Sequence, residues 1–396
     1  MQKATRQQTK EHNRSLVLKT IFEHASISRA EIARITSLTR ATVSEIVSDL
    51  MAESLVEEIG LGTSIGGKSP ILLSLVDNSR YLIGLDLAQN QFSGAIINLR
   101  GQIHETIDLP VNNRNGDEAL ALVYQIIDNL VRDEFRPLVG IGVGAPGLVN
   151  TREGVVVNAV NLDWRDLPLA HLLETRYQLP VFVLNDSQAA AMGEYTYGEA
   201  NSQHSNLIVI NVGHGIGAGI VIDGQLFQGD GGGAGEIGHV VVVPDGGLAC
   251  RCGNHGCLET IASAQAVLKR VKELARQSNQ DILGCDPESI TFPILVQAFA
   301  DGDPLVRQVV LDAGRYLGLA ISSLVGTLNI QKIVLSGDMT RFGPPWLDAI
   351  QKTLGQTSLS RLAQETQVDI GQLGRNRIVL GASALLLKDD LLLMNR

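Results

Sequence analysis

Three of the four cysteines lie within the eight residues from Cys250 to Cys257, and this cluster limits the possible fold more than any other feature. Thiols crowded together in a chain whose start has no secretory leader are more typical of metal ligands than of disulfides. Together with the upstream His239, Cys250, Cys252 and Cys257 would complete a Cys3His tetrahedron, the closed coordination of structural zinc. The stretch therefore predicts a zinc site.

The fourth ligand stays open at this point, because His255 lies inside the same stretch and spacing does not separate it from His239. Three cysteines brought together by chance, without a metal, are the competing interpretation. Two carboxylates, Glu236 and Glu259, flank the proposed metal. A zinc clamp between them would fix their separation, as a preformed polar site requires.

Asn185 and Asp186 form a second polar feature, between a predicted strand over 181–184 and a small-residue helix over 187–194. This pair can hydrogen-bond vicinal hydroxyls, and the aspartate could deprotonate one of them. An ordinary N-cap aspartate is the alternative, since aspartate is frequent at that position.

Strand patterns repeat along the chain. We expect strands over 81–87, 92–99 and 102–109, a helix over 117–132 and a buried strand over 138–145. A similar opening recurs at 206–212 and, after a glycine turn, 219–226. The repetition predicts two related α/β lobes, with ligands bound between them at strand carboxyl ends.

These motifs together resemble those of the ROK family of sugar kinases and sugar-responsive repressors. Its members carry a Glu-x-Gly-His element, here Glu236–His239, and a Cys-x-Cys-Gly-x-x-Gly-Cys-x-Glu signature, here Cys250–Glu259. The resemblance implies a duplicated ribonuclease-H-like (actin-like) α/β body with a structural zinc. It also implies a sugar site, in which Asp186 corresponds to the catalytic base of the kinases. The residues carried over to this site are Asn185, Asp186, Glu236, His239 and Glu259, with Gly147 and Asn161 as further contacts.

Residues 1–78 predict a winged helix-turn-helix. Helical spacing predicts a first helix over 13–24, the capping box Ser28-Arg-Ala-Glu31 opens a second, and Leu38-Thr39 opens a third. Strands over 55–59 and 71–75 around a Gly/Ser-rich loop predict the wing. The expected DNA contacts are Thr39, Arg40, Thr42 and Ser44 of the third helix and Lys68 of the wing. ROK repressors carry such a head, and their wing often contains a Gly-Gly-Arg-Pro-like element. This chain has Gly66-Gly-Lys-Ser-Pro70 instead. Lys68 can still meet a phosphate, but it lacks the planar guanidinium of arginine.

The first phosphate loop separates a regulator from a kinase. ROK kinases carry Asp-x-Gly-x-Thr there, whereas this chain reads Asp86-Leu-Ala88-Gln-Asn90. An added Cβ and a lost hydroxyl should damage phosphate binding, so we expect neither ATP binding nor kinase activity. The alternatives are an ATP-dependent sugar kinase with an appended head and a sugar-binding scaffold whose head serves only dimerisation.

Charge is unevenly distributed. The formal net charge is −10, yet the first 50 residues contain eight Lys/Arg against five Asp/Glu. An acidic body with a slightly basic head fits DNA binding confined to the head.

No apolar run predicts a membrane span, so we expect a cytoplasmic protein. Its expected domains are the head (1–78), a first lobe (79–190, joined by a C-terminal helix over 381–396) and a zinc-containing second lobe (191–380). The expected partners are palindromic operator DNA, a monosaccharide effector and a second copy of the chain in a homodimer or dimer of dimers. A sugar-transport protein is the alternative signal. The head and residues 161–164 resemble those of xylose-type repressors.

Overall fold

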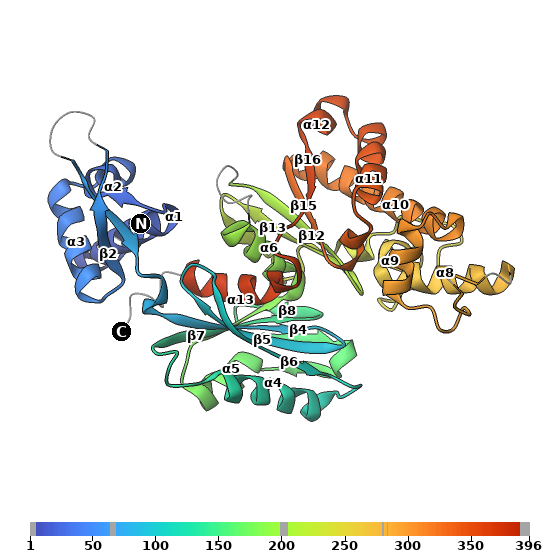
Figure 1. The fold of residues 1–396 in the computed structure, drawn as a ribbon, viewed down its shortest axis with the longest axis horizontal. Coiled ribbons are helices and arrows are strands. Elements are labelled where there is room, and N and C mark those ends of the chain that lie inside the picture. The colour runs from blue at the N-terminus through green and yellow to red at the C-terminus, as the bar shows by residue number, and fades with distance from the viewer. Residues whose placement is uncertain (1–4, 64–68, 199–204, 279–280, 283, 389–396) are drawn as a thin grey trace.

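The computed structural model describes residues 5–63, 69–198, 205–278, 281–282 and 284–388. The chain forms a small N-terminal head and two α/β lobes (Figure 1). The head lies at one end of the molecule beside the first lobe, and the second lobe lies on the other side of a pair of central helices. Most of the regular elements belong to the two lobes.

The head is a winged helix-turn-helix. Its elements are α1 (Arg6–Glu23), β1 (Ile27–Ser28), α2 (Arg29–Thr36), α3 (Arg40–Ala52), β2 (Val56–Leu61) and β3 (Ile71–Leu75). The predicted capping box is present, because Ser28 Oγ accepts from the backbone N of Glu31 and the Glu31 carboxylate accepts from the backbone N of Ser28. The apolar stripe of α3 (Val43, Ile46, Val47 and Leu50) is buried, as its spacing predicted.

The first helix is longer than predicted. It begins at Arg6 rather than near residue 13, because Thr5 caps it and Gln8 completes a second capping box. Its first two turns carry no apolar periodicity, so a pattern search based on hydrophobic spacing misses them.

The first lobe is built on a five-stranded sheet of order β11-β7-β4-β5-β6. Its strands are β4 (Tyr81–Leu87), β5 (Gln91–Asn98), β6 (Ile103–Pro110), β7 (Leu138–Ala145) and β11 (Val181–Asn185). Helices α4 (Gly116–Leu130) and α5 (Leu169–Tyr177) cover one face (Figure 1). The connection between β7 and β11 contains a small sheet of β8 (Leu148–Asn150), β9 (Val155–Ala159) and β10 (Trp164–Leu167). Two short 3-10 helices complete the lobe: η1 (Asp77–Ser79) precedes β4, and η2 (Val160–Leu162) precedes β10.

The second lobe has a sheet of order β14-β13-β12-β15-β16. Its strands are β12 (Leu207–Val212), β13 (Ile216–Ile222), β14 (Gln225–Phe227), β15 (Lys332–Ser336) and β16 (Gln367–Ile370). The helices are η4 (Ile237–His239), α7 (Glu259–Ala262), α8 (Ala264–Ser278), α9 (Phe292–Ala300), α10 (Pro304–Leu328), η5 (Asp338–Phe342), α11 (Pro344–Thr357), α12 (Ser360–Glu365) and η6 (Gly374–Asn376). By length and composition α10 could cross a membrane, but half of that window is buried and its apolar residues join the core of this lobe.

The two sheets have the same topology. In each, three consecutive antiparallel strands are followed by two parallel strands on the side of the first strand. The repetition predicted from the sequence is therefore present in the fold. The stretch over 219–226, which continues the repeated opening, contains a hairpin: Asp223 (φ 50°) and Gly224 (φ 72°) form a tight turn between β13 and β14.

Two helices fill the space between the sheets. These are α6 (Asp186–Tyr197), which contacts β12 and β13, and α13 (Arg377–Lys388), which contacts β4 and β7. They cross closely because small residues meet at the contact: a Cβ on Gly381 would lie 1.6 Å from the carbonyl oxygen of Ala189. The helix predicted to begin at residue 381 begins at Arg377, and the part of the prediction beyond residue 388 lies outside the described residues.

Candidate functional site

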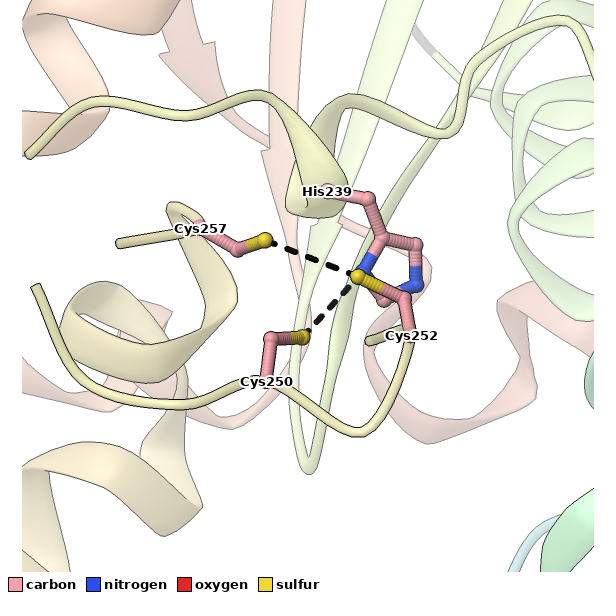
Figure 2. Close-up of side chains that lie close together, drawn as sticks. All are labelled: His239, Cys250, Cys252 and Cys257. Atoms are coloured by element: carbon pink, nitrogen blue, oxygen red, sulfur yellow. Dashed lines mark hydrogen bonds between the residues drawn. The ribbon is translucent and has the colours of Figure 1, made fainter. Parts of the chain in front are cut away.

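His239, Cys250, Cys252 and Cys257 lie together, with one ligand atom from each residue within 4.8 Å of the others (Figure 2). A tetrahedral zinc site with Zn–S bonds of about 2.3 Å has S–S edges of about 3.8 Å and slightly shorter S–N edges. The Sγ atoms of Cys252 and Cys257 are 3.7 Å apart, and Cys250 Sγ lies 3.5 Å from Nδ1 of His239. The four side chains therefore fit a zinc ion, with His239 rather than His255 in the cluster.

Glycine allows the tight turns of this loop. Gly256 has φ 71°, and a Cβ there would lie 1.8 Å from the carbonyl oxygen of Val243. Its backbone N donates to Leu248 and its carbonyl accepts from Val242 and Val243. An alanine at this position would push the two arms of the loop apart and separate the ligands.

The second ring nitrogen of His239 faces away from the cysteines. Its Nε2 lies 3.8 Å from Oε2 of Glu236. Burial raises the pKa of Glu236, His239 lowers it, and the carboxylates of Asp186 and Glu259 raise it further. A metal on Nδ1 would therefore orient an imidazole whose other edge is available to Glu236 and a ligand.

Asn185 and Asp186 lie at the carboxyl end of β11, where α6 begins. The Asn185 amide donates to the carbonyl of Gly147 at 2.8 Å, and its Oδ1 accepts from the backbone N of Ser187 at 2.9 Å. Asn185 thus caps α6, so the alternative interpretation of an N-cap aspartate was wrong: Asp186 is the first residue of the helix. Asn185 also links two of the predicted sugar residues through its bond to Gly147. Gly147 has φ 81°, and a Cβ there would lie 2.1 Å from the carbonyl oxygen of Asn158, so the position requires glycine.

Asp186 and Glu259 bring further carboxylates to this region. Asp186 Oδ1 accepts hydrogen bonds from the backbone N and Oγ of Ser187 at 2.6 and 3.1 Å. Its pKa is raised by burial; these bonds and Arg377 oppose the shift, and Glu259 adds to it. Glu259 is the first residue of α7, and its Oε2 accepts from the backbone N of Ile216 at 3.0 Å. The charge of Glu259 is thus close enough to Asp186 and Glu236 to raise the pKa of both. Together the three carboxylates offer hydrogen-bond acceptors suited to hydroxyl groups.

Asp86 and Arg377 belong to the same region, although the sequence did not single out Arg377. Asp86 lies at the end of β4, beside Gly144 of β7. Burial, and then the charge of Asp186, raises the pKa of Asp86 to about 7. Arg377 opposes this shift, and its Nη2 donates to Oδ1 of Asn211 in the second lobe at 3.0 Å. Among the described residues, Asp86 Oδ1 and Arg377 Nε are buried without a hydrogen-bond partner.

Asn161 has two side-chain partners. Its Nδ2 donates to Oε1 of Gln89 at 3.3 Å, and its Oδ1 accepts from Nη1 of Arg251 at 2.9 Å. Sequence reasoning missed Arg251 and Gln89. The signal available for Arg251 was its position between two proposed metal ligands.

A cavity of about 210 Å³ lies between loops of the two lobes. Residues 150–153 of the first lobe and residues 228–232 of the second lobe line it. None of the predicted sugar residues is among its lining residues, although the second loop continues directly to Glu236. This cavity therefore adjoins the proposed sugar residues without containing them.

In the head, Thr39, Arg40 and Ser44 are exposed at the start of α3. Thr39 caps the helix: its Oγ1 accepts from the backbone N of Thr42 at 3.2 Å and lies 2.9 Å from Oγ1 of Thr42. Short hydroxyls and an arginine at the start of the third helix are placed where this motif meets base edges and phosphates. Lys68 lies outside the described residues.

Comparisons with known proteins agree with this architecture. The ROK family matches residues 82–389, and a winged helix-turn-helix DNA-binding family matches residues 11–57. The chain is 32% identical over 389 residues to the xylose repressor of Caldicellulosiruptor bescii, covering 96% of this chain and 97% of that one. A ROK family transcriptional regulator described as a homologue of the Escherichia coli MLC protein aligns with a TM-score of 0.86 and 29% identity over 98% of both chains. A ROK glucokinase from Streptomyces griseus aligns with a TM-score of 0.69 and 30% identity over 77% of this chain and 98% of its own.

The chain belongs to the ROK family. Within it, the winged head and the similarity to repressors over nearly the full length place the chain among the sugar-responsive transcriptional repressors. The glucokinase similarity covers a smaller part of the chain. These comparisons favour a regulator over an enzyme, as the altered phosphate loop predicted.

Proposed function

We propose that the protein is a cytoplasmic repressor of carbohydrate-utilisation genes that releases its operator when a monosaccharide binds between the two lobes. The arrangement that supports this most is the meeting of Asn185, Asp186, Glu236, His239 and Glu259, contributed by both lobes, in a chain that also carries a DNA-binding head. The similarity to a xylose repressor makes D-xylose the first sugar to test.

Zinc has a structural role in this proposal. His239, Cys250, Cys252 and Cys257 would hold it in closed tetrahedral coordination, with no position left for a reacting ligand. Its chemical contribution is to fix the tautomer and direction of His239, which then presents Nε2 beside Glu236.

Helix α13 offers a physical route from the sugar residues to the head. At its start, Arg377 contacts Asn211 and influences Asp86 and Asp186. Towards its other end, Leu386 is part of the core cluster that contains the head residues Ile21 and Leu73. A change in lobe arrangement around Arg377 would therefore move α13, and with it Leu386, which packs against the head.

The head is also tied to the first lobe by hydrogen bonds. Arg100 donates to the backbone carbonyls of Phe22 and His24, and Arg80 donates to that of Glu53. In a homodimer, or a dimer of dimers, a lobe movement passed through these contacts would change the spacing of two heads on a palindromic operator. A sugar-transport protein remains an alternative signal to the sugar.

Operator binding in the presence of sugars tests the proposal. A duplex selected from genomic DNA is titrated with protein by fluorescence anisotropy, with D-xylose, D-glucose and other aldopentoses and aldohexoses added in turn. We expect one sugar to weaken operator binding. The Glu236→Gln variant should bind the duplex normally and lose the response, because it keeps the shape of the side chain and removes its charge beside His239. Unchanged affinity with every sugar would contradict the proposal.

A further inference from the structure

Arg251, the residue between Cys250 and Cys252, reaches from the second lobe to the first. Its Nη1 donates to Oδ1 of Asn161 at 2.9 Å, and its Nη2 lies 4.0 Å from Oε1 of Glu259. One side chain thus contacts two of the residues predicted to bind sugar, one in each lobe.

The link extends into the sheet of each lobe. On one side, Asn161 Nδ2 donates to Gln89, which lies in the loop after β4. On the other, Glu259 Oε2 accepts from the backbone N of Ile216, the first residue of β13. A series of polar contacts therefore joins the end of a strand in the first lobe to the start of a strand in the second.

The loop that carries Arg251 is held in place. The backbone N of Cys250 donates to the carbonyl of Asn254 at 2.8 Å, and that of Gly253 donates to the carbonyl of Cys250 at 3.1 Å. The neighbouring Cys250 and Cys252 side chains belong to the metal cluster. The arginine therefore extends from a fixed backbone, so its contact with Asn161 costs side-chain entropy but no further ordering of the loop.

We propose that Arg251 and Asn161 form a cross-lobe clasp that holds the lobes in the arrangement in which the sugar residues face one another. Both are then positioning residues, and Asn161 acts on the sugar through Arg251 rather than by contacting it. As a statement about sugar affinity, the clasp rests on the proposed function. Removing the clasp lowers the fraction of molecules competent to bind, so the apparent affinity falls by that fraction.

The expected loss of sugar affinity on removing the clasp depends on how exposed the Arg251 side chain is. The Arg251 side chain is 53% exposed, so its pairing is partly screened by water. We expect Arg251→Ala to weaken sugar binding about two- to fivefold, the range that corresponds to a well-oriented pair near the surface.

A double-mutant cycle distinguishes a clasp from two independent sugar contacts. Sugar affinity is measured calorimetrically for wild type, Arg251→Ala, Asn161→Ala and the double variant, using the sugar that binds wild type. We expect the double variant to be no weaker than either single variant. Asn161→Asp turns the contact with Arg251 into an ion pair but loses the amide that donates to Gln89, so it should bind the sugar more tightly than Asn161→Ala. Additive losses, or tighter binding by Arg251→Ala, would overturn the proposal.

Lobe separation gives a readout that does not depend on sugar. Spin labels on unnatural amino acids at the exposed positions Glu134 and Lys352, one in each lobe, leave the cysteines free. We expect a broader distance distribution in Arg251→Ala and Asn161→Ala than in wild type, with unchanged zinc content. The control is Arg361→Ala, which removes an arginine paired with Glu365 inside the second lobe. If wild type binds no sugar, the proposed function fails, and an unchanged distance distribution would separately refute the clasp.

Discussion

Replacing Asp86 by asparagine should stabilise the first lobe at neutral pH. Asp86 lies at the end of β4 with Oδ1 buried and unpaired among the described residues, and the nearby charge of Asp186 opposes its ionisation. Asparagine has almost the same shape and no charge to bury. The substitution therefore removes an electrostatic cost without creating a cavity.

The magnitude follows from the shift in pKa. The pKa of Asp86 rises from 3.8 to about 7 on folding. At about 1.4 kcal/mol for each tenfold change in proton affinity, an ionised Asp86 costs the folded protein about 4 kcal/mol. Between these two values the unfolded chain binds fewer protons than the folded one, so stability falls as pH rises through this window. The cost is absent below pH 3.8 and complete above about pH 7.

The two tryptophans allow the assay to report on one lobe. Trp164 is buried in the core of the first lobe and Trp346 in that of the second, so a Trp346→Phe background leaves a fluorescence reporter for the first lobe. Urea unfolding is compared at pH 5 and pH 8 with and without Asp86→Asn, and with Asp133→Asn as an exposed control. We expect the stabilisation by Asp86→Asn to be clearly larger at pH 8. An equal gain at both values, or a loss at pH 8, would refute the reasoning.

Three further predictions concern the metal, the head and the central helices. Cys252→Ser should abolish stoichiometric zinc measured by mass spectrometry, whereas Cys285→Ser, outside the cluster, should retain it. Ser28→Ala removes the cap of α2 and should cost the head about 1 kcal/mol in urea unfolding. The exposed Ser48→Ala, inside α3, should cause no loss, because alanine favours the helix more than serine does. Gly381→Ala should lower the melting temperature sharply, since its Cβ would lie 1.6 Å from the Ala189 carbonyl; a normal melting temperature would contradict this helix contact.

The sequence predicted the parts of the structure that depend on local pattern. The capping box at Ser28 and the buried stripe of α3 follow from spacing along one helix, and the repeated strand pattern predicted two lobes whose sheets share one topology. The cysteine spacing predicted the cluster, but the choice of His239 over His255 needed the fold, because His239 reaches the cysteines from a separate segment.

The features that were missed depend on contacts between distant segments. Arg377 is the first residue of α13, before the apolar residues on which the helix prediction was based. Its role depends on Asp86, Asp186 and Asn211, which only the fold brings near it. Arg251 meets Asn161 across 90 residues of sequence. No periodicity or spacing rule encodes such pairs, since each depends on how two lobes are placed relative to one another.

Sugar affinity measured with and without bound operator tests most directly whether the two sites are coupled. Thermodynamic linkage requires that a sugar which weakens operator binding by some factor is itself bound more weakly, by the same factor, to the operator complex. We therefore predict a higher calorimetric Kd for the effective sugar when the protein is saturated with operator duplex, in a ratio equal to the loss of operator affinity. Identical Kd values for free and operator-bound protein would contradict a sugar-responsive repressor.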